Sequence, residues 1–599
     1  MDKFIIPERN EISAEFQWKL TDIYATDTNW ESDIDAVKKQ MPQIQSKKGQ
    51  ITQSAHLLWT ALDLRSKINQ TLEKLFAYAR MHRDENAASP VYQAMTNKIQ
   101  ALEAEASAAY AFMEPEILTL PTKTLENFLR EEQRLEEYRF YLENLTKQKK
   151  HILSAQEEAL LSAFGDVAQA SAETFQMLAR ADITFPAVYD TSKQELPLSE
   201  GRYHSFMISP DRQVRQQAFK NLLGTYKNYR NTFASTLRGN IKKDIFYAKT
   251  RHYSSHLAAS LEPDEIPLSF YDQLIATVHK HLPAMERYVS LKKKILNVPE
   301  LHMYDMYAPL TNQIRLAYSY EEAVKLVKQA LAPLGKEYLA DLSTGLASGW
   351  VDVYENKGKQ TGAYSWGVYG VHPFVLLNFD GKYNDVSTLA HELGHAMHSY
   401  YSQKKQPYPT SSYTIFCAEV ASTTNEILLI DHVLATTADR SIQAYLLNQY
   451  LESIRTTVYR QTMFAEFEQK VYMLAETGES LTAELFENLW RELNAKYYGP
   501  ELVIDDSLVS EWSRIPHFYR SFYVYKYATG YSAATAFANH LSTDEKTAQK
   551  QYLNFLSSGG SDYSLNLLKA GGVDLASGKP IEQTLVKFSQ LLDKLEALL

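Results

Sequence analysis

Cysteine, blocks of positive charge and long apolar runs are scarce or missing in this chain of 599 residues. Cys417 is the only cysteine, so no disulfide can form within the chain. No apolar run approaches the ~18 residues that a membrane span requires. The segment from Met1 to Pro7 is quickly followed by charges and lacks the apolar core of a signal peptide. We therefore expect a cytoplasmic protein without a membrane partner.

Charge of one sign is not concentrated anywhere in the chain. Lysine and arginine number 62, aspartate and glutamate 72, and the formal net charge is -10 at pH 7. Since nucleic-acid phosphates require a basic stripe on the protein, we expect no nucleic-acid partner. The hydrophobic content of 45% is ordinary for a globular protein and allows a large buried core.

Glycine and proline are sparse in the helical segments from residue 12 to about 180, where apolar residues recur with helical period. Thr28-x-x-Glu31 and Ser154-x-x-Glu157 indicate capping boxes, in which the hydroxyl and the carboxylate each satisfy a free backbone donor. Long helices packed on one another are therefore expected.

The period changes between residues 181 and 208. Ile183 to Pro186 and Arg202 to Met207 flank a polar, turn-rich stretch, which predicts a β-hairpin. We place the domain boundary here, with an N-terminal helical domain at residues 1–195 and a second domain at residues 196–599.

A stretch that can carry chemistry runs from His391 to His395 and reads H-E-x-x-H. Apolar residues recur every four positions through it, which predicts a helix over about residues 385–402. On a helix, positions i and i+4 share one face about 6 Å apart. Two imidazoles there can bind one zinc ion, and Glu392 can reach a metal-bound water from the side.

A second predicted helix, at about residues 413–433, carries a candidate third ligand, Glu419. Catalytic zinc takes three protein ligands and keeps a fourth position for water. We therefore predict one Zn²⁺ per chain, held by His391, His395 and Glu419. Glu426 lies on the same stripe two turns later and is a candidate acceptor for the free N–H of a metal-bound histidine. An ordinary surface carboxylate is the alternative for Glu426.

The best β-signal lies between residues 350 and 380. Trp350 to Tyr354 and Phe374 to Phe379 bracket a glycine-rich segment. Such a segment can offer an open edge, to which an extended peptide adds as a further strand. A purely structural hairpin is the alternative.

His391 to Ser399 (HELGHAMHS) followed by Phe416 to Glu426 (FCAEVASTTNE) resembles the thimet-oligopeptidase family of zinc peptidases, in particular its oligoendopeptidase F branch. The order and spacing of three further stretches fit: Gly362-Ala363-Tyr364, Pro516-His517-Phe518-Tyr519, and Tyr523 to Gly530. The resemblance covers nearly the whole chain. It implies a mainly α, multi-helix, two-lobed peptidase with a small β-region near the zinc helix and a deep cleft between the lobes.

This resemblance also implies an activity, the cleavage of internal bonds in short unfolded oligopeptides, with folded proteins excluded. Glu392 is the expected general base acting on a zinc-bound water. Gly362, Ala363 and Tyr364 are the expected substrate-binding residues.

The family uses donors from the aromatic region at residues 517–531 to stabilise the developing oxyanion. By resemblance we expect this role first of His517, then of Tyr525, and less directly of Tyr519. A stripe of this kind is otherwise core packing with phenol groups at the surface.

Two other functions remain open. A zinc carboxypeptidase would need a cation for the terminal carboxylate of its substrate, and Arg514 or Arg520 could supply it. A non-catalytic peptide-binding protein with a structural zinc is the second alternative. Glu392 and an open fourth ligand position argue against it, because a structural site requires neither.

Overall fold

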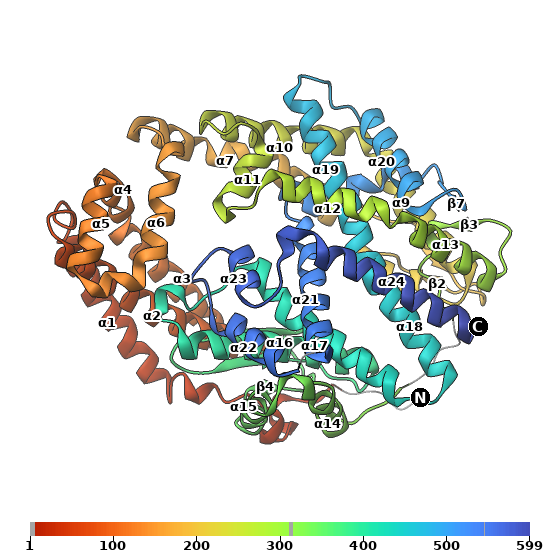
Figure 1. Cartoon of the computed structure of the whole chain (residues 1–599), viewed down its shortest axis with the longest axis horizontal. Helices are drawn as coiled ribbons and strands as arrows, with labels where there is room; N and C mark the ends of the chain where they lie inside the picture. The colour runs from red at the N-terminus through yellow and green to blue at the C-terminus, as the bar shows by residue number, and fades with distance from the viewer. Residues whose placement is uncertain (1–5, 311–315, 544) are drawn as a thin grey trace. The chain divides into compact units, whose positions relative to one another are not determined.

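The structure is a computed structural model that describes residues 6–310, 316–543 and 545–599 (Figure 1). Helices dominate it and the sheets are few and small, so the predicted mainly α fold is confirmed. No helix in these ranges combines the length and the apolar character that crossing a membrane requires.

The chain forms two compact units, each built from three segments. Unit 1 comprises Met1–Lys149, Arg315–Val433 and Phe537–Val573, and unit 2 comprises Lys150–Ile314, Leu434–Ala536 and Asp574–Leu599. Each unit therefore contains residues from both sides of position 195. The predicted boundary between residues 1–195 and 196–599, like the predicted cleft between two lobes, stays a prediction.

The helices of unit 1 come from all three of its segments. They are α1 Asp27–Gln45, α2 Ala55–Glu85, α3 Pro90–Tyr110, α4 Met113–Thr119, α5 Thr122–Glu131, α6 Arg139–Lys147, α14 Tyr320–Ala330, α15 Lys336–Ala347, α16 Tyr383–Lys405, α17 Ile415–Thr436, α22 Glu545–Ser557 and α23 Ser564–Ala570. The last three residues of α17 belong to unit 2.

A three-stranded sheet in unit 1 has the order β4-β6-β5, formed by β4 Val351–Asp352, β5 Tyr364–Gly367 and β6 Pro373–Leu376. Strand β4 is parallel to β6, and β5 is antiparallel to it. The sheet packs on α16 and also shares the hydrophobic core of helices α1 to α3, through Phe374 and Leu376. The predicted small β-region therefore lies beside the predicted zinc helix.

Unit 2 is also helical. Its helices are α7 Ala155–Met177, α8 Glu200–Met207, α9 Arg212–Asn228, α10 Arg230–Thr250, α11 His256–Leu261, α12 Leu268–Lys280, α13 Leu282–Leu296, α18 Arg440–Ile454, α19 Arg460–Glu476, α20 Ala483–Tyr498, α21 Tyr525–Thr543, whose last seven residues belong to unit 1, and α24 Lys579–Leu598. Strand β3 Leu301–His302 pairs in parallel with β7 Leu502–Val503.

A short β-hairpin does lie within residues 181–208, but neither predicted strand is right: Ile183 to Pro186 is not a strand, and the hairpin is formed by the residues between the two predicted strands. Strands β1 Val188–Tyr189 and β2 Glu195–Leu196 pair antiparallel. The segment expected as the second strand is instead helix α8, because the Ser199 hydroxyl caps it and accepts from the backbone N–H of Arg202 at 3.3 Å.

Helix capping likewise follows the sequence in one case and departs from it in another. Ser154 and Glu157 form the predicted capping box of α7. The box predicted at Thr28 is wrong, because α1 already begins at Asp27. Its cap is Thr26, whose side chain accepts from the backbone N–H of Asn29 at 3.3 Å.

Candidate metal centre

The H-E-x-x-H stretch lies in the middle of α16, which extends the predicted helix by a few residues at both ends. The Asp385 carboxylate accepts the backbone N–H of Lys382 at 2.9 Å and closes the first turn. Leu389, Leu393 and Met397 are all buried, so this face anchors α16 in the core of unit 1.

Gly394, inside the motif, allows α17 to approach the backbone of α16 directly. A Cβ on Gly394 would lie 2.6 Å from the Cα of Ser422 and 2.8 Å from the carbonyl oxygen of Ala421. Both separations are too short for any side chain. The close approach brings Glu419 of α17 opposite the two histidines of α16. Sequence reasoning missed the packing role of Gly394. A glycine within an otherwise regular helix was a signal, because it costs about 1 kcal/mol relative to alanine.

Three predicted ligands converge at one place. The Nε2 atoms of His391 and His395 lie 3.7 and 3.9 Å from Oε2 of Glu419. The candidate ligand atoms of the three side chains all lie within 4.8 Å of one another. Ligand atoms around a tetrahedral zinc ion are separated by roughly 3.3 Å, given bond lengths of about 2.0–2.2 Å. Small side-chain movements would therefore let two nitrogens and one carboxylate oxygen hold a zinc ion.

Glu426 contacts the other side of the His391 ring. The Nδ1–H of His391 donates a hydrogen bond to Oε1 of Glu426, and Nε2, on the other side of the ring, lies 3.7 Å from Oε2 of Glu419. Burial opposes protonation of His391, but the hydrogen bond and charge of Glu426 raise its pKa to about 9. Burial and the neighbouring charge of His391 lower the pKa of His395 to about 3.

Glu392 is buried beside this group with only 7% of its surface exposed. Its Oε2 atom has no hydrogen-bond partner among the residues that the structure describes. Burial, and then the charges of Glu419 and Glu426, raise its pKa to about 7, although the charge of His391 opposes this. A buried carboxylate oxygen without a partner costs free energy, so its retention points to a ligand or a reacting group at this position.

His398, one turn after His395, does not belong to the ligand group. Its ring stacks on Tyr413 with the ring centres 3.6 Å apart, and burial lowers its pKa to about 3. A neutral histidine held in the core is consistent with packing.

The Gly362-Ala363-Tyr364 stretch leads into β5, at the edge of the sheet. The carbonyl of Gly362 accepts from the side-chain amide of Asn378 at 2.8 Å. The hydroxyl of Tyr364 donates to Oδ2 of Asp84 at 3.0 Å, so this group is already engaged. Strand β5 pairs with β6 on one side and with no other strand in the described ranges, which leaves its outer backbone edge for a further strand.

His517, Tyr519 and Tyr525 belong to unit 2, whereas the ligand group belongs to unit 1. His517 lies in a short 3₁₀ turn, Pro516–Tyr519, and burial together with the charge of Arg520 lowers its pKa. The Tyr519 hydroxyl lies 2.7 Å from Oγ1 of Thr236, and its ring stacks on Phe175 at 4.2 Å. The roles expected of these three residues stay predictions.

Tyr525 begins α21 and is fully buried, which raises the pKa of its hydroxyl well above the usual value. Sequence reasoning did not single out Tyr527, whose hydroxyl lies 3.5 Å from Nε2 of His517. The alternation of tyrosines at positions 523, 525 and 527 was a signal, but it could not say which of them approaches the histidine.

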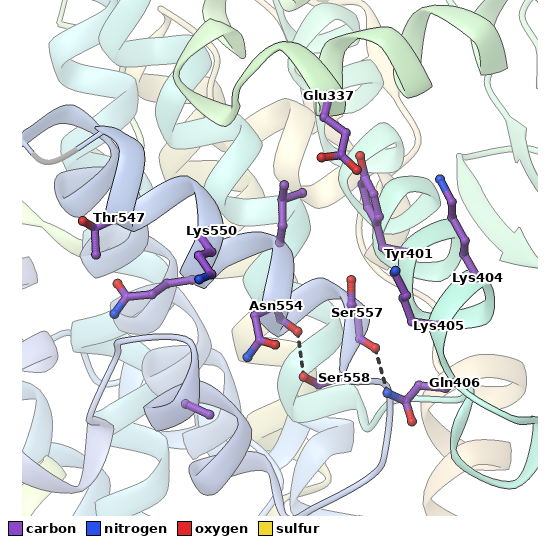
Figure 2. Close-up of a pocket in the computed structure, with 13 residues that line it drawn as sticks. Glu337, Tyr401, Lys404, Lys405, Gln406, Thr547, Lys550, Asn554, Ser557 and Ser558 are labelled. Atoms are coloured by element: carbon purple, nitrogen blue, oxygen red, sulfur yellow. Dashed lines mark hydrogen bonds between the residues drawn. The ribbon is translucent and has the colours of Figure 1, made fainter.

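A pocket of about 710 Å³ lies at the C-terminal end of α16 (Figure 2). Lys404 and Lys405 of α16 line it on one side, and Lys550 and Asn554 of α22 on the other (Figure 2). None of the predicted site residues lines this pocket, so it is separate from the candidate metal centre.

Two protein-family models match most of this chain. Residues 205–587 match the model of peptidase family M3, and residues 116–185 match the model described as oligopeptidase F. The two matches together cover both the candidate metal centre and the aromatic region around His517.

Full-length relatives agree with these matches. The chain is 44% identical over 594 residues to oligopeptidase PepF of Bacillus subtilis, covering 99% of this chain and 89% of the relative. It is 39% identical over 591 residues to an oligoendopeptidase F homologue of Lactococcus lactis, covering 98% of both. The crystal structure of oligoendopeptidase-F from Enterococcus faecium superimposes with a TM-score of 0.73 at 36% identity, covering 96% of this chain and 99% of that one. The resemblance inferred from the motifs is confirmed, and the chain belongs to peptidase family M3, among the oligopeptidase F proteins.

Proposed function

We propose that this peptidase is a zinc-dependent endopeptidase that hydrolyses internal bonds of short, unfolded oligopeptides. One observation carries the proposal: two histidine nitrogens and a carboxylate oxygen converge beside the buried, unpartnered Oε2 of Glu392. A group of three ligands with a general base next to it is the arrangement that catalytic zinc sites require. The oligopeptidase and oligoendopeptidase names of the relatives support the substrate class.

His391, His395 and Glu419 would hold the zinc ion. When bound, zinc supplies Lewis acidity, which polarises the peptide carbonyl and lowers the pKa of water to near 7. Glu426 keeps the proton of His391 on Nδ1, so that Nε2 is available as a ligand atom.

Glu392 moves the proton in this proposal. Its Oε2 accepts a proton from the attacking water and then delivers it to the nitrogen of the leaving amine. The position of Glu392 supports this role, because its carboxylate is buried next to the ligand His391 and its Oε2 has no hydrogen-bond partner among the described residues.

Strand β5 would position the substrate. A peptide added along its outer edge would form main-chain hydrogen bonds, which are independent of the peptide sequence. In this scheme the backbone near Gly362 and Ala363 contributes to substrate binding, while the Tyr364 hydroxyl stays on Asp84.

Stabilisation of the oxyanion is assigned to His517 and Tyr525, with Tyr519 as the weaker candidate. Each donor of this kind typically contributes ~2.7–4 kcal/mol to lowering the barrier. A cytoplasmic location, expected from the sequence, stays a prediction.

The carboxypeptidase alternative needs an available cation near the substrate terminus. Arg514 is already paired with the carboxylate of Glu200 and lies over the ring of Tyr203 at 4.8 Å. Arg520 lies over the ring of Tyr523 at 4.4 Å. Because Arg514 is already engaged by Glu200, it is a poor candidate for binding a terminal carboxylate, which favours the endopeptidase. Arg520 has no such ion pair among the described residues and is the residue to test for the carboxypeptidase.

The experiment uses an internally quenched peptide with both ends blocked, and compares the wild type with Glu392→Gln at equal, measured zinc occupancy. We expect the wild type to cut an internal bond and the variant to bind zinc without turnover. If the wild type shortens an unblocked peptide but leaves the blocked peptide intact, the protein is a carboxypeptidase and the proposal is wrong. No cleavage of either peptide by the zinc-loaded wild type would replace it with a binding protein.

A further inference from the structure

A second pocket in unit 1, of about 490 Å³, is formed by α2, α3, β5 and the 3₁₀ turn Tyr408–Thr410. Four aromatic rings contribute to its wall: Phe76, Tyr110, Trp366 and Tyr408. The rings of Phe76 and Trp366 pack with their centres 5.7 Å apart. The pocket therefore brings together residues from four separate elements of unit 1.

Two carboxylates also line this pocket, Glu73 of α2 and Glu103 of α3, and both are half-buried. The described lining contains no lysine, arginine or histidine. Burial raises the pKa of Glu73, while hydrogen bonds from the Tyr369 backbone and the Tyr408 hydroxyl, and the charge of Lys74, oppose the shift. Burial alone raises the pKa of Glu103. Lys74 is the cation whose charge acts on Glu73, and it does not line the pocket, so the carboxylates are the charged groups among the lining residues.

Aromatic faces and carboxylates attract the same kind of ligand. The faces of tryptophan and tyrosine attract an ammonium or guanidinium group, and a nearby carboxylate adds a charge-assisted hydrogen bond. We propose that this pocket binds the cationic side chain of a lysine or arginine in a peptide substrate that lies along β5. This inference rests on the proposed endopeptidase function and adds a substrate preference to it.

The position of Trp366 connects the pocket to the strand edge. Side chains alternate along β5, so Tyr364 and Trp366 share one face, and Gly367 faces the other way. The first face packs on α2, through Trp366 against Phe76 and Tyr364 against Asp84. Gly367 lies against α16, because a Cβ there would come 2.6 Å from the Cβ of Ser399.

A peptide strand added to β5 would lie about 4.8 Å from it. Residues directly opposite one another on neighbouring strands project to the same face of the sheet. A peptide residue opposite Trp366 would therefore project toward α2 and the pocket, and not toward α16. A long basic side chain at that position can reach Glu73 and Glu103 while its aliphatic part packs on the rings.

The test uses quenched peptides with both ends blocked, in which each position near the cut bond carries either arginine or citrulline, its neutral isostere. We expect one position at which arginine raises kcat/KM about tenfold over citrulline. The ratio should fall toward one in Glu103→Gln and in Glu73→Gln. Glu105→Gln, an exposed position on the same helix, is the matched control and should keep the wild-type ratio.

Equal rates for arginine and citrulline at every position would overturn the inference while leaving the endopeptidase function in place. The inference would also be overturned if Glu73→Gln and Glu103→Gln, with the unfolding midpoint of the wild type, both kept its preference for arginine over citrulline. A preference that requires a free N-terminus would identify the terminal ammonium as the occupant and overturn the side-chain assignment. Failure of the wild type to cut any blocked peptide would remove the proposed function itself.

Discussion

Gly394 of α16 and Ser422 of α17 are in backbone contact: a Cβ on Gly394 would lie 2.6 Å from the Cα of Ser422. This contact sets the separation of the two helices that carry the three predicted ligands. Because Gly394 has no side chain, α17 can come close enough to bring Glu419 near His391 and His395.

Gly394→Ala should push α17 away from α16. Overpacking of a tight contact typically costs 1–3 kcal/mol, and we expect zinc affinity and peptidase activity to fall together with the unfolding midpoint. Zinc affinity can be measured by competition with a chromophoric chelator. Gly224→Ala in α9 is the control, because a Cβ there meets nothing within 4 Å, and it should leave zinc affinity unchanged. Wild-type affinity in Gly394→Ala would contradict the assigned importance of this contact.

Glu426→Gln should weaken zinc binding without removing a ligand. The hydrogen bond from His391 Nδ1 to Glu426 orients the ring, and loss of such a partner typically lowers metal affinity 10- to 100-fold. Competition titration against the wild type measures this change. Glu126→Gln, at an exposed position of α5, should titrate like the wild type. Equal zinc affinities for Glu426→Gln and the wild type would show that Glu426 is an ordinary surface carboxylate.

Tyr525→Phe and His517→Ala should each lower kcat by about 10²–10³ with little change in KM, if they donate to the oxyanion. Tyr519→Phe is expected to lose less activity, because its hydroxyl already lies 2.7 Å from Thr236 Oγ1. Steady-state kinetics at saturating zinc measures all three. A larger loss for Tyr519→Phe than for Tyr525→Phe would reverse the assignment of the two tyrosines.

Glu452 of unit 2 should make folding stability depend on pH in the acid range. Burial opposes ionisation of this carboxyl, but Arg455 and Lys292 lower its pKa to about 2, with Lys292 Nζ at 3.2 Å. Because the folded pKa lies below the unfolded value of about 4.5, its stabilisation is present above pH 4.5 and lost as the pH falls toward 2.

Replacing Glu452 by Gln should therefore lower the thermal unfolding midpoint most at pH 6–7. The difference in unfolding midpoint between variant and wild type should narrow as the pH falls from 4.5 toward 2. Glu492→Gln, exposed on α20, should follow the wild type at every pH. A gap that stays constant with pH would show that the carboxylate charge does not provide the stabilisation.

Local sequence patterns were sufficient for most of the candidate site. Helical geometry alone places the two histidines at i and i+4 on one face, and it likewise places Glu419 and Glu426 on one stripe. Glu392, one residue after His391, projects to the side of that face. The mainly α fold follows from the same periodicity. Both strands predicted for the hairpin at residues 181–208 were misplaced, and the second of them is a helix that begins after the capping residue Ser199.

Contacts between distant segments could not be read in this way. The approach of Ser422 to Gly394, the engagement of the Tyr364 hydroxyl by Asp84, and the pairing of Arg514 with Glu200 join residues far apart in the sequence. The pocket of Glu73, Glu103 and Trp366 is of the same kind. Periodicity reports which face of an element is apolar, whereas the partner of that face depends on how the elements pack. The sequence thus specified the chemistry of the predicted ligands, and packing determined which groups stand beside them.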